Sequence, residues 1–203
     1  MIKNIVFDVN GVLVSNISIE TIISFSQDYT IAEAAMLRKM GRTEIWKRYD
    51  TGFCRTRESM ADDFIALWPQ DEKMIRQTLS SRRGIAVNER MEKFIVELKR
   101  KYKVYLLSNV GYEDLEKVLP QKFARICDGA VYSCEVGVVK PDERIYRILL
   151  DRYDLKAEET VFIDDGRRNI RAAQKLGFHA VKHVSNKRTM SEICRIASLE
   201  QEI

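Results

Sequence analysis

Short apolar runs alternate with helical patterns over most of the chain. The first run, at residues 3–8, has three consecutive apolar side chains before Asp8 and predicts a buried strand. Comparable runs predict further strands at 103–107, 130–133, 160–163 and 179–182. Helical spacing predicts helices near 88–101, after Gly111, at 141–153, at 168–176 and at the C-terminal end. This alternation predicts an α/β core with a parallel sheet that is covered on both faces.

Residues 17–83 follow a different pattern. Apolar side chains recur there at three- and four-residue spacing, and strand-like alternation is missing. The pattern predicts an all-helical insertion of about 70 residues. A chain of 203 residues is long for one compact domain and short for two, which fits a core with one insertion.

Composition and charge narrow the classes of function. With 45% hydrophobic and 32% charged residues, the chain can bury a sizeable core. Its net charge of +4 suits a small anionic substrate and is too weak to indicate nucleic-acid binding. The first apolar run is too short for a signal peptide, and no stretch approaches the roughly 18 apolar residues of a membrane helix. We therefore expect a cytoplasmic protein with no nucleic-acid or membrane partner. The sequence does not indicate an oligomeric state.

Two further residue types suggest little chemistry of their own. The four cysteines form no metal-binding pattern, and we expect reduced thiols. His179 and His183 flank the last predicted strand, away from the other candidate residues. We expect both histidines to be structural or surface residues.

Candidate catalytic residues stand at the ends of the first two predicted strands. Asp8 ends the first strand just before a glycine turn, where α/β sheets bind ligands. A carboxylate there can be a nucleophile that forms an aspartyl-phosphate, a metal ligand or a helix cap. Ser108 and Asn109 end the second strand, just before a new helix. A hydroxyl beside helix-start N–H groups can hold a phosphate oxygen, although serine and asparagine also commonly end strands.

Lys140 and the pair Asp164-Asp165 are the other candidates. Lys140 precedes Pro141 at the predicted start of a helix, an unfavourable place for a cation unless an anion lies nearby. A bound phosphate would supply that anion, and an exposed surface lysine is the alternative. Adjacent carboxylates at a buried strand end repel each other, and Mg²⁺ relieves this repulsion with Asp8 and Asp165 as ligands. Helix capping by Asp165 is the alternative.

Four stretches in this order resemble the motifs of the haloacid dehalogenase superfamily: Phe7–Leu13, Leu107–Asn109, Gly137–Pro141 and Phe162–Asp165. The resemblance spans nearly the whole chain. It implies a Rossmann-like, three-layer α/β/α core of residues 1–16 and 84–203. It also implies that residues 17–83 form a helical cap inserted after the first motif.

The resemblance also implies a role for each candidate. Asp8 would be the nucleophile, and Asp165 would bind Mg²⁺ directly. Asp164 would lie beside Asp165, either as a further direct ligand of Mg²⁺ or in contact with the direct ligands. The backbone carbonyl of Asn10 would be a further metal ligand.

The phosphate would be positioned by Ser108 and Lys140, and Asn109 would contribute to substrate binding. Within the superfamily the chain is most similar to the glucose-1-phosphatase type, through Ile45–Gly52 and Asp164–Ile170.

Asn10 departs from the superfamily's pattern. The related phosphatases usually carry an aspartate at this position as the general acid, and an amide cannot donate a proton near neutral pH. Three functions therefore stay open. The first is a Mg²⁺-dependent phosphatase acting on a small phosphorylated metabolite, with sugar phosphates among the candidates. The second is a protein that binds a phosphometabolite or a partner without turnover. The third is a 2-haloacid dehalogenase, which has no need of the acid pair Asp164-Asp165.

Overall fold

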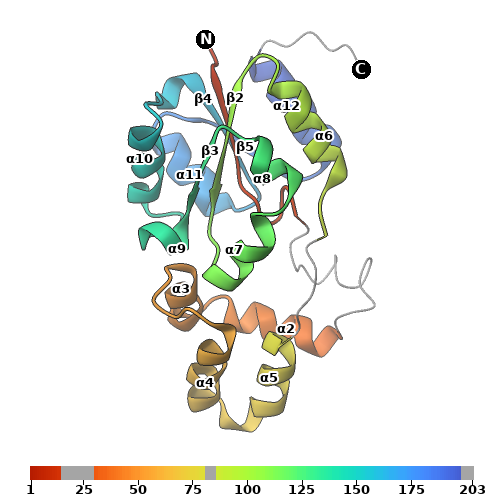
Figure 1. Ribbon diagram of the computed structural model, residues 1–203, viewed down its shortest axis with the longest axis vertical. Coiled ribbons are helices and arrows are strands. Elements are labelled where there is room, and N and C mark those ends of the chain that lie inside the picture. Colours follow the sequence, from red (N-terminus) through yellow and green to blue (C-terminus); the bar gives the residue numbers. More distant parts are fainter. Residues whose placement is uncertain (15–29, 81–85, 198–203) are drawn as a thin grey trace.

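The computed structural model describes residues 1–14, 30–80 and 86–197. Five parallel strands form one sheet in the order β3-β2-β1-β4-β5 (Figure 1). Their bounds are β1 (Asn4–Phe7), β2 (Lys103–Ser108), β3 (Gly129–Tyr132), β4 (Thr160–Asp164) and β5 (His179–Lys182). The predicted α/β core with a parallel sheet is confirmed, and each strand lies where the apolar runs predicted one.

The central strand β1 explains why the sheet has two buried faces. Successive side chains of a strand point to opposite faces, so Ile5 and Phe7 enter one side and Val6 enters the other. All three side chains are fully buried. A strand covered on both faces needs a continuous apolar run, which is the pattern that β1 has.

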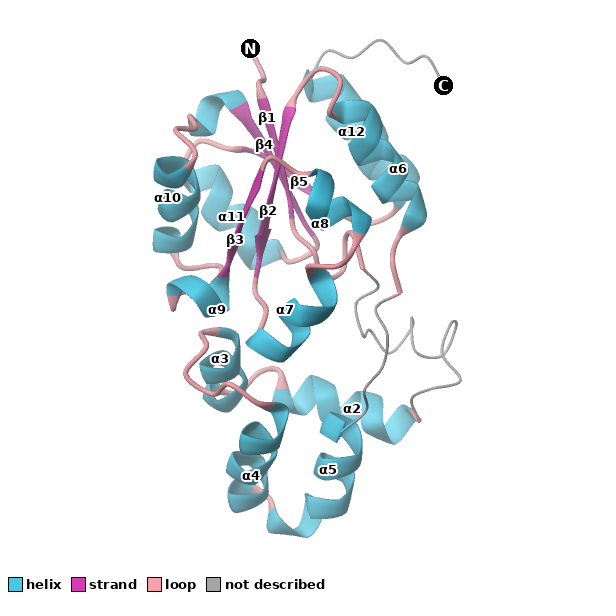
Figure 2. Cartoon of the chain, viewed as in Figure 1, coloured by secondary structure: helices cyan, strands magenta, loops and turns pink. Residues whose placement is uncertain are grey.

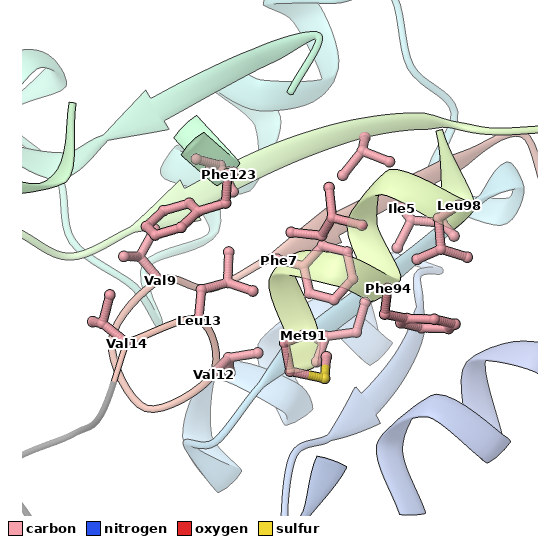
Figure 3. Packing of buried hydrophobic residues seen from close by; sticks show 14 of the residues in the cluster. Ile5, Phe7, Val9, Val12, Leu13, Val14, Met91, Phe94, Leu98 and Phe123 are labelled. Atoms are coloured by element: carbon pink, nitrogen blue, oxygen red, sulfur yellow. The ribbon is translucent and has the colours of Figure 1, made fainter. Parts of the chain in front are cut away.

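Helices cover both faces of the sheet (Figure 1). The face that Phe7 enters is covered by α6 (Glu89–Leu98), α7 (Tyr112–Val118), α8 (Lys122–Ile126) and α12 (Asn186–Ala197). Figure 3 shows this packing around Phe7, with Met91 and Phe94 of α6 nearby. The opposite face is covered by α10 (Glu143–Arg152) and α11 (Arg167–Lys175). The core therefore has three layers.

The described part of the insertion, residues 30–80, consists of helices joined by turns and loops (Figure 2). It consists of α2 (Ile31–Met40), α3 (Glu44–Asp50), α4 (Arg57–Leu67), a 3₁₀ turn (Pro69–Asp71) and α5 (Glu72–Ser80). We call these residues the helical segment. Threonine side chains accept a backbone N–H at the start of its first three helices, at Thr30, Thr43 and Thr56. The segment has a core of its own that includes Met40, Met60, Phe64 and Ile75.

The bounds of the predicted cap stay a prediction. Residues 17–29 and 81–83 of the predicted insertion lie outside the described residues, including the helical pattern that begins near Ile17. Helices α2 to α5 of the helical segment lie beyond the carboxyl ends of β1 and β2 (Figures 1 and 2).

Specific contacts hold the helical segment against the core. The Tyr49 ring lies so close to Gly111 that a Cβ added there would overlap it. Arg57 at the start of α4 forms an ion pair with Asp114 of α7, with Nη2 and Oδ1 2.6 Å apart. The Ser133 hydroxyl donates to the backbone carbonyl of Asp50 at 2.6 Å. On the side of the segment, these contacts come from the end of α3 and the start of α4.

Some elements differ from the prediction. The helix predicted from Pro141 begins at Glu143, with Asp142 as its N-cap. The short helices α8 and α9 (Ser133–Val136) and a 3₁₀ turn at Ala157–Glu159 were not predicted. They are too short for a hydrophobic period to identify them. None of the described helices has the length and apolar character needed to cross a bilayer.

Candidate active site

Asp8 stands at the carboxyl end of the central strand. Its backbone N–H donates to the Ile163 carbonyl at 2.8 Å, which extends the pairing of β1 with β4 by one residue. The chain then turns sharply at Gly11, which has a φ of 82°, and the Val9 carbonyl accepts three N–H groups of this turn. The Asp8 side chain is buried, and its Oδ1 accepts the Val9 N–H at 2.7 Å. The turn therefore fixes the orientation of the carboxylate.

The Lys140 ammonium lies at the centre of the site. Its Nζ donates to the Leu107 carbonyl at 2.7 Å and contacts Asp164 Oδ2 at 2.7 Å and Asp8 Oδ1 at 2.8 Å. An ammonium has three N–H groups, so each has one acceptor here. The side chain is only 1% exposed, and the surface-lysine alternative is wrong. The anions that stabilise Lys140 include two carboxylates of the protein itself.

Asp164 and Asp165 have different surroundings. Asp164 is fully buried, and its oxygens accept N–H groups from Lys140, Asn169 and Gly166 at 2.7–3.0 Å. Asp165 is half-buried. Asp8, Asp164 and Asp165 each offer one oxygen, and these oxygens all lie within 4.8 Å of one another. The structure therefore brings together the three carboxylates that the sequence singled out.

The charges of this cluster do not balance. Three carboxylates face one ammonium, which leaves an excess of two negative charges when all are ionised. Burial raises the pKa of Asp8 well above its usual range; Lys140 opposes this, and Asp164 and Asp165 add to it. Burial alone would lower the pKa of Lys140, yet the charges of Asp8 and Asp164 raise it overall. Both directions follow from excess negative charge in a buried place, which favours uptake of a proton or a cation.

This donor set fits Mg²⁺. The ion prefers oxygen ligands and is commonly bound by one or two carboxylates. A divalent cation would also compensate the two excess negative charges of the cluster. Asp165 is the more exposed of the two strand-end carboxylates, since it is half-buried and Asp164 is fully buried.

Ser108 and its neighbour Asn109 have unequal surroundings. Ser108 ends β2 and is 1% exposed, and its hydroxyl lies 3.5 Å from the Asn109 carbonyl. The Asn109 amide is bonded at both ends to the main chain of Lys140. The side-chain amide of Asn10 donates to the Asn109 carbonyl at 3.1 Å. All the sequence-predicted candidates therefore lie in one place, but Asn109 is engaged with the protein itself.

Two residues of this site were missed by the sequence reasoning. Asn169, on the first turn of α11, donates from Nδ2 to both oxygens of Asp164. His183 was expected away from the other candidates, yet its backbone N–H donates to the Asp164 carbonyl at 2.9 Å. Burial lowers the pKa of the His183 ring, and the nearby charge of Asp165 opposes this. A signal for His183 was available, since this residue directly follows the predicted strand 179–182 and parallel strands bring their carboxyl ends to one edge of a sheet.

The sheet is parallel, and the cluster of carboxylates and lysine lies at its carboxyl edge. This arrangement is typical of α/β enzymes, whose active sites lie at the carboxyl ends of the strands. The sequence model of the haloacid dehalogenase-like hydrolases matches residues 2–177, and the chain belongs to this hydrolase family. The resemblance read from the four motifs is thereby confirmed.

Individual relatives include proteins of two named activities. The chain is 28% identical to D-ribitol-5-phosphate phosphatase of Bacteroides thetaiotaomicron, over 88% of this chain and 90% of that protein. A solved structure of the HAD family enzyme bt-2542 from the same organism, in complex with magnesium and inorganic phosphate, matches with a TM-score of 0.67. It is 23% identical and covers 91% of this chain and 95% of its own. A solved dehalogenase matches with a TM-score of 0.70 at 19% identity, over 96% of both chains. At these identities the two structures show a shared fold.

Proposed function

We propose that this protein is a Mg²⁺-dependent phosphatase that hydrolyses the phosphomonoester of a small metabolite. The observation that carries the proposal is the buried cluster of Asp8, Asp164, Asp165 and Lys140, with its excess of negative charge. The name of the ribitol-phosphate relative and the magnesium–phosphate complex of the structural relative support it.

Asp8 is the nucleophile in this proposal. One carboxylate oxygen attacks the phosphorus atom while the bond from phosphorus to the leaving oxygen breaks, which gives an aspartyl-phosphate. Since Asn10 cannot act as the general acid, the leaving oxygen takes its proton from the solvent and departs as an alcohol. Water then attacks the phosphorus atom of the intermediate and gives up a proton to the solvent. The bond from phosphorus to the Asp8 oxygen breaks, and inorganic phosphate leaves with the carboxylate restored. The bonds from Val9 N–H and Lys140 to Oδ1 hold the group in one orientation before the attack.

The metal would be held by Asp8, Asp165 and the backbone carbonyl of Asn10. When bound, Mg²⁺ supplies positive charge that lets an anionic phosphate approach the buried carboxylates. Asp164 contributes indirectly, because it holds Lys140 at 2.7 Å.

Ser108 and Lys140 are the proposed phosphate contacts. Ser108 is the last residue of β2, which pairs with β1. Its hydroxyl therefore lies close to where the phosphate of a substrate would lie when Asp8 attacks it. Lys140 must exchange one of its three acceptors to donate to a phosphate oxygen. The phosphate oxygen takes the place of the acceptor that Lys140 releases, so the ammonium keeps three hydrogen bonds.

In this proposal the helical segment acts as a cap over the carboxyl edge of the sheet and selects the substrate. This position suits a small phosphorylated sugar or sugar alcohol, the class to which the named substrate of the ribitol-phosphate relative belongs.

The test is phosphate release from a panel of phosphomonoesters that includes D-ribitol 5-phosphate and glucose 1-phosphate. We expect turnover with Mg²⁺ and its loss with a chelator, and we expect Asp8→Asn to lose nearly all turnover. An Asp8→Asn variant that keeps Mg²⁺-dependent turnover would overturn the nucleophile assignment. Chloride release from 2-haloacids without Mg²⁺ would instead identify a dehalogenase. Binding of phosphorylated metabolites without turnover would identify a binding protein.

A further inference from the structure

The side chain of Asn109 holds the main chain of a single residue, Lys140. The Lys140 N–H donates to Asn109 Oδ1 at 2.8 Å, and Asn109 Nδ2 donates to the Lys140 carbonyl at 3.0 Å. The two residues belong to separate loops, one directly after β2 and the other between α9 and α10. Only a side chain with both an acceptor and a donor on one planar group can make this pair of bonds, and a carboxylate cannot.

Lys140 depends on such a support because its loop is not part of the sheet. Its ammonium must still reach Asp8 Oδ1 at 2.8 Å and Asp164 Oδ2 at 2.7 Å. Displacement of the Lys140 main chain would lengthen these contacts together. A misplacement of about 1 Å near a reacting group can cost about 10²-fold in rate.

A second amide extends this arrangement to the first strand. Asn10 Nδ2 donates to the Asn109 carbonyl at 3.1 Å. Asn10 follows Asp8 by two residues, and the Lys140 ammonium contacts Asp8. The bonds therefore close a ring that joins the loops after β1 and β2 to the loop that carries Lys140.

We propose that Asn109 is a positioning residue, which sets the place of the Lys140 ammonium relative to Asp8 and does not itself bind the substrate phosphate. This inference replaces the substrate-binding role expected for Asn109. Its kinetic consequence rests on the proposed phosphatase function, whereas its structural consequence does not.

The decisive variant is Asn109→Asp. It keeps the size of the side chain and the acceptor for the Lys140 N–H, but it places an oxygen against the Lys140 carbonyl. We expect kcat to fall about 10- to 100-fold at about pH 7.5, with a smaller change in KM. The ratio of variant to wild-type kcat should rise as the pH falls, because a protonated carboxyl can again donate to that carbonyl. Asn186→Ala is the matched control, because the Asn186 amide bonds to another side-chain amide, that of Asn88, and not to the main chain of Lys140.

A spectroscopic measurement on the metal-free protein separates this inference from the proposed activity. A buried ammonium with three bonded N–H groups exchanges its protons slowly, so Lys140 should give a ¹H–¹⁵N signal that is absent from Lys140→Arg. We expect Asn109→Asp and Asn109→Ala to shift or broaden this signal and Asn186→Ala to preserve it. If Asn109→Ala does not fold, the isosteric Asn109→Asp decides.

A signal missing from the wild type, or unchanged in both Asn109 variants, overturns the inference. An altered signal with wild-type kcat in Asn109→Asp also overturns it, since the displaced ammonium would then have no effect on the reaction. The third outcome is an altered signal in the Asn109 variants together with a wild type that releases no phosphate from any substrate. This outcome supports the inference and overturns the proposed function.

Discussion

Asp50, the last residue of α3, offers a test of how the helical segment is held against the core. Burial, and to a lesser degree the charge of Asp114, raises the pKa of its carboxyl from 3.8 to about 7. The folded protein therefore holds this proton more tightly than the unfolded chain does. The contribution of Asp50 to stability is most favourable below about pH 4, declines as the pH rises to about 7, and is then constant.

The magnitude follows from the two pKa values. A shift from 3.8 to about 7 corresponds to at most about 4 kcal/mol lost between about pH 4 and pH 8, at about 1.36 kcal/mol per pH unit. Water reaches part of the half-buried side chain, so we expect a loss of about 1–2 kcal/mol. In the Asp50→Asn variant the side-chain amide would carry no charge at any of these pH values. This variant should therefore be more stable than the wild type at about pH 8 and nearly equal to it at about pH 4.5.

Urea unfolding followed by tryptophan fluorescence measures this difference. The two tryptophans of the chain, Trp46 and Trp68, both lie in the helical segment, so the signal reports on that part of the protein. Asp151→Asn, at an exposed aspartate of α10, is the matched control. Parallel curves of unfolding free energy against pH for the wild type and Asp50→Asn would refute the reasoning.

Three further predictions concern the site and its support. Asp165→Ala should weaken Mg²⁺ binding at least about tenfold while the fold persists, which calorimetric titration measures; unchanged affinity would exclude Asp165 as a ligand. Asn10→Asp should raise kcat for poor leaving groups by up to about 10²–10⁴-fold and leave activated substrates unaffected, because the Asn109 carbonyl favours a protonated acid beside it. Equal dependence of log kcat on leaving-group pKa in both proteins would show that another group supplies the proton. Gly111→Ala should lower stability by about 1–3 kcal/mol, since its Cβ would overlap the Tyr49 ring, and the added change Tyr49→Leu should restore part of this in thermal unfolding.

The strands of this fold could be predicted because each one is a local signal. Ile5, Val6 and Phe7 form a continuous apolar run, and a strand covered on both faces requires one. The gathering of Asp8, Ser108 and Asp164 followed from the topology, since parallel strands bring their carboxyl ends to one edge. The start of α10 was misplaced because Pro141 suits a first helical turn, whereas Asp142 caps the helix through its bond to the Arg144 N–H.

The partners within the site could not be predicted. The sequence indicated an anion near Lys140 but could not show that two of its own carboxylates and the Leu107 carbonyl take that place. These acceptors lie 24 or more residues away in the chain, and only the folded geometry selects them. The same holds for the Asn109 amide, whose partner is 31 residues away.

If the helical segment sets substrate preference, as proposed, its contacts with α7 limit how that preference could be changed by exchanging the segment with that of a relative. A donor segment would have to present an aromatic ring to the bare backbone at Gly111 and a cation to Asp114, as Tyr49 and Arg57 do here. A smaller residue at position 49 would leave a void. A neutral residue at position 57 would leave the negative charge of Asp114 less well compensated. Because Gly111 follows Asn109 by only two residues, a poorly matched graft would disturb the hydrolytic site as well as the specificity it was meant to change.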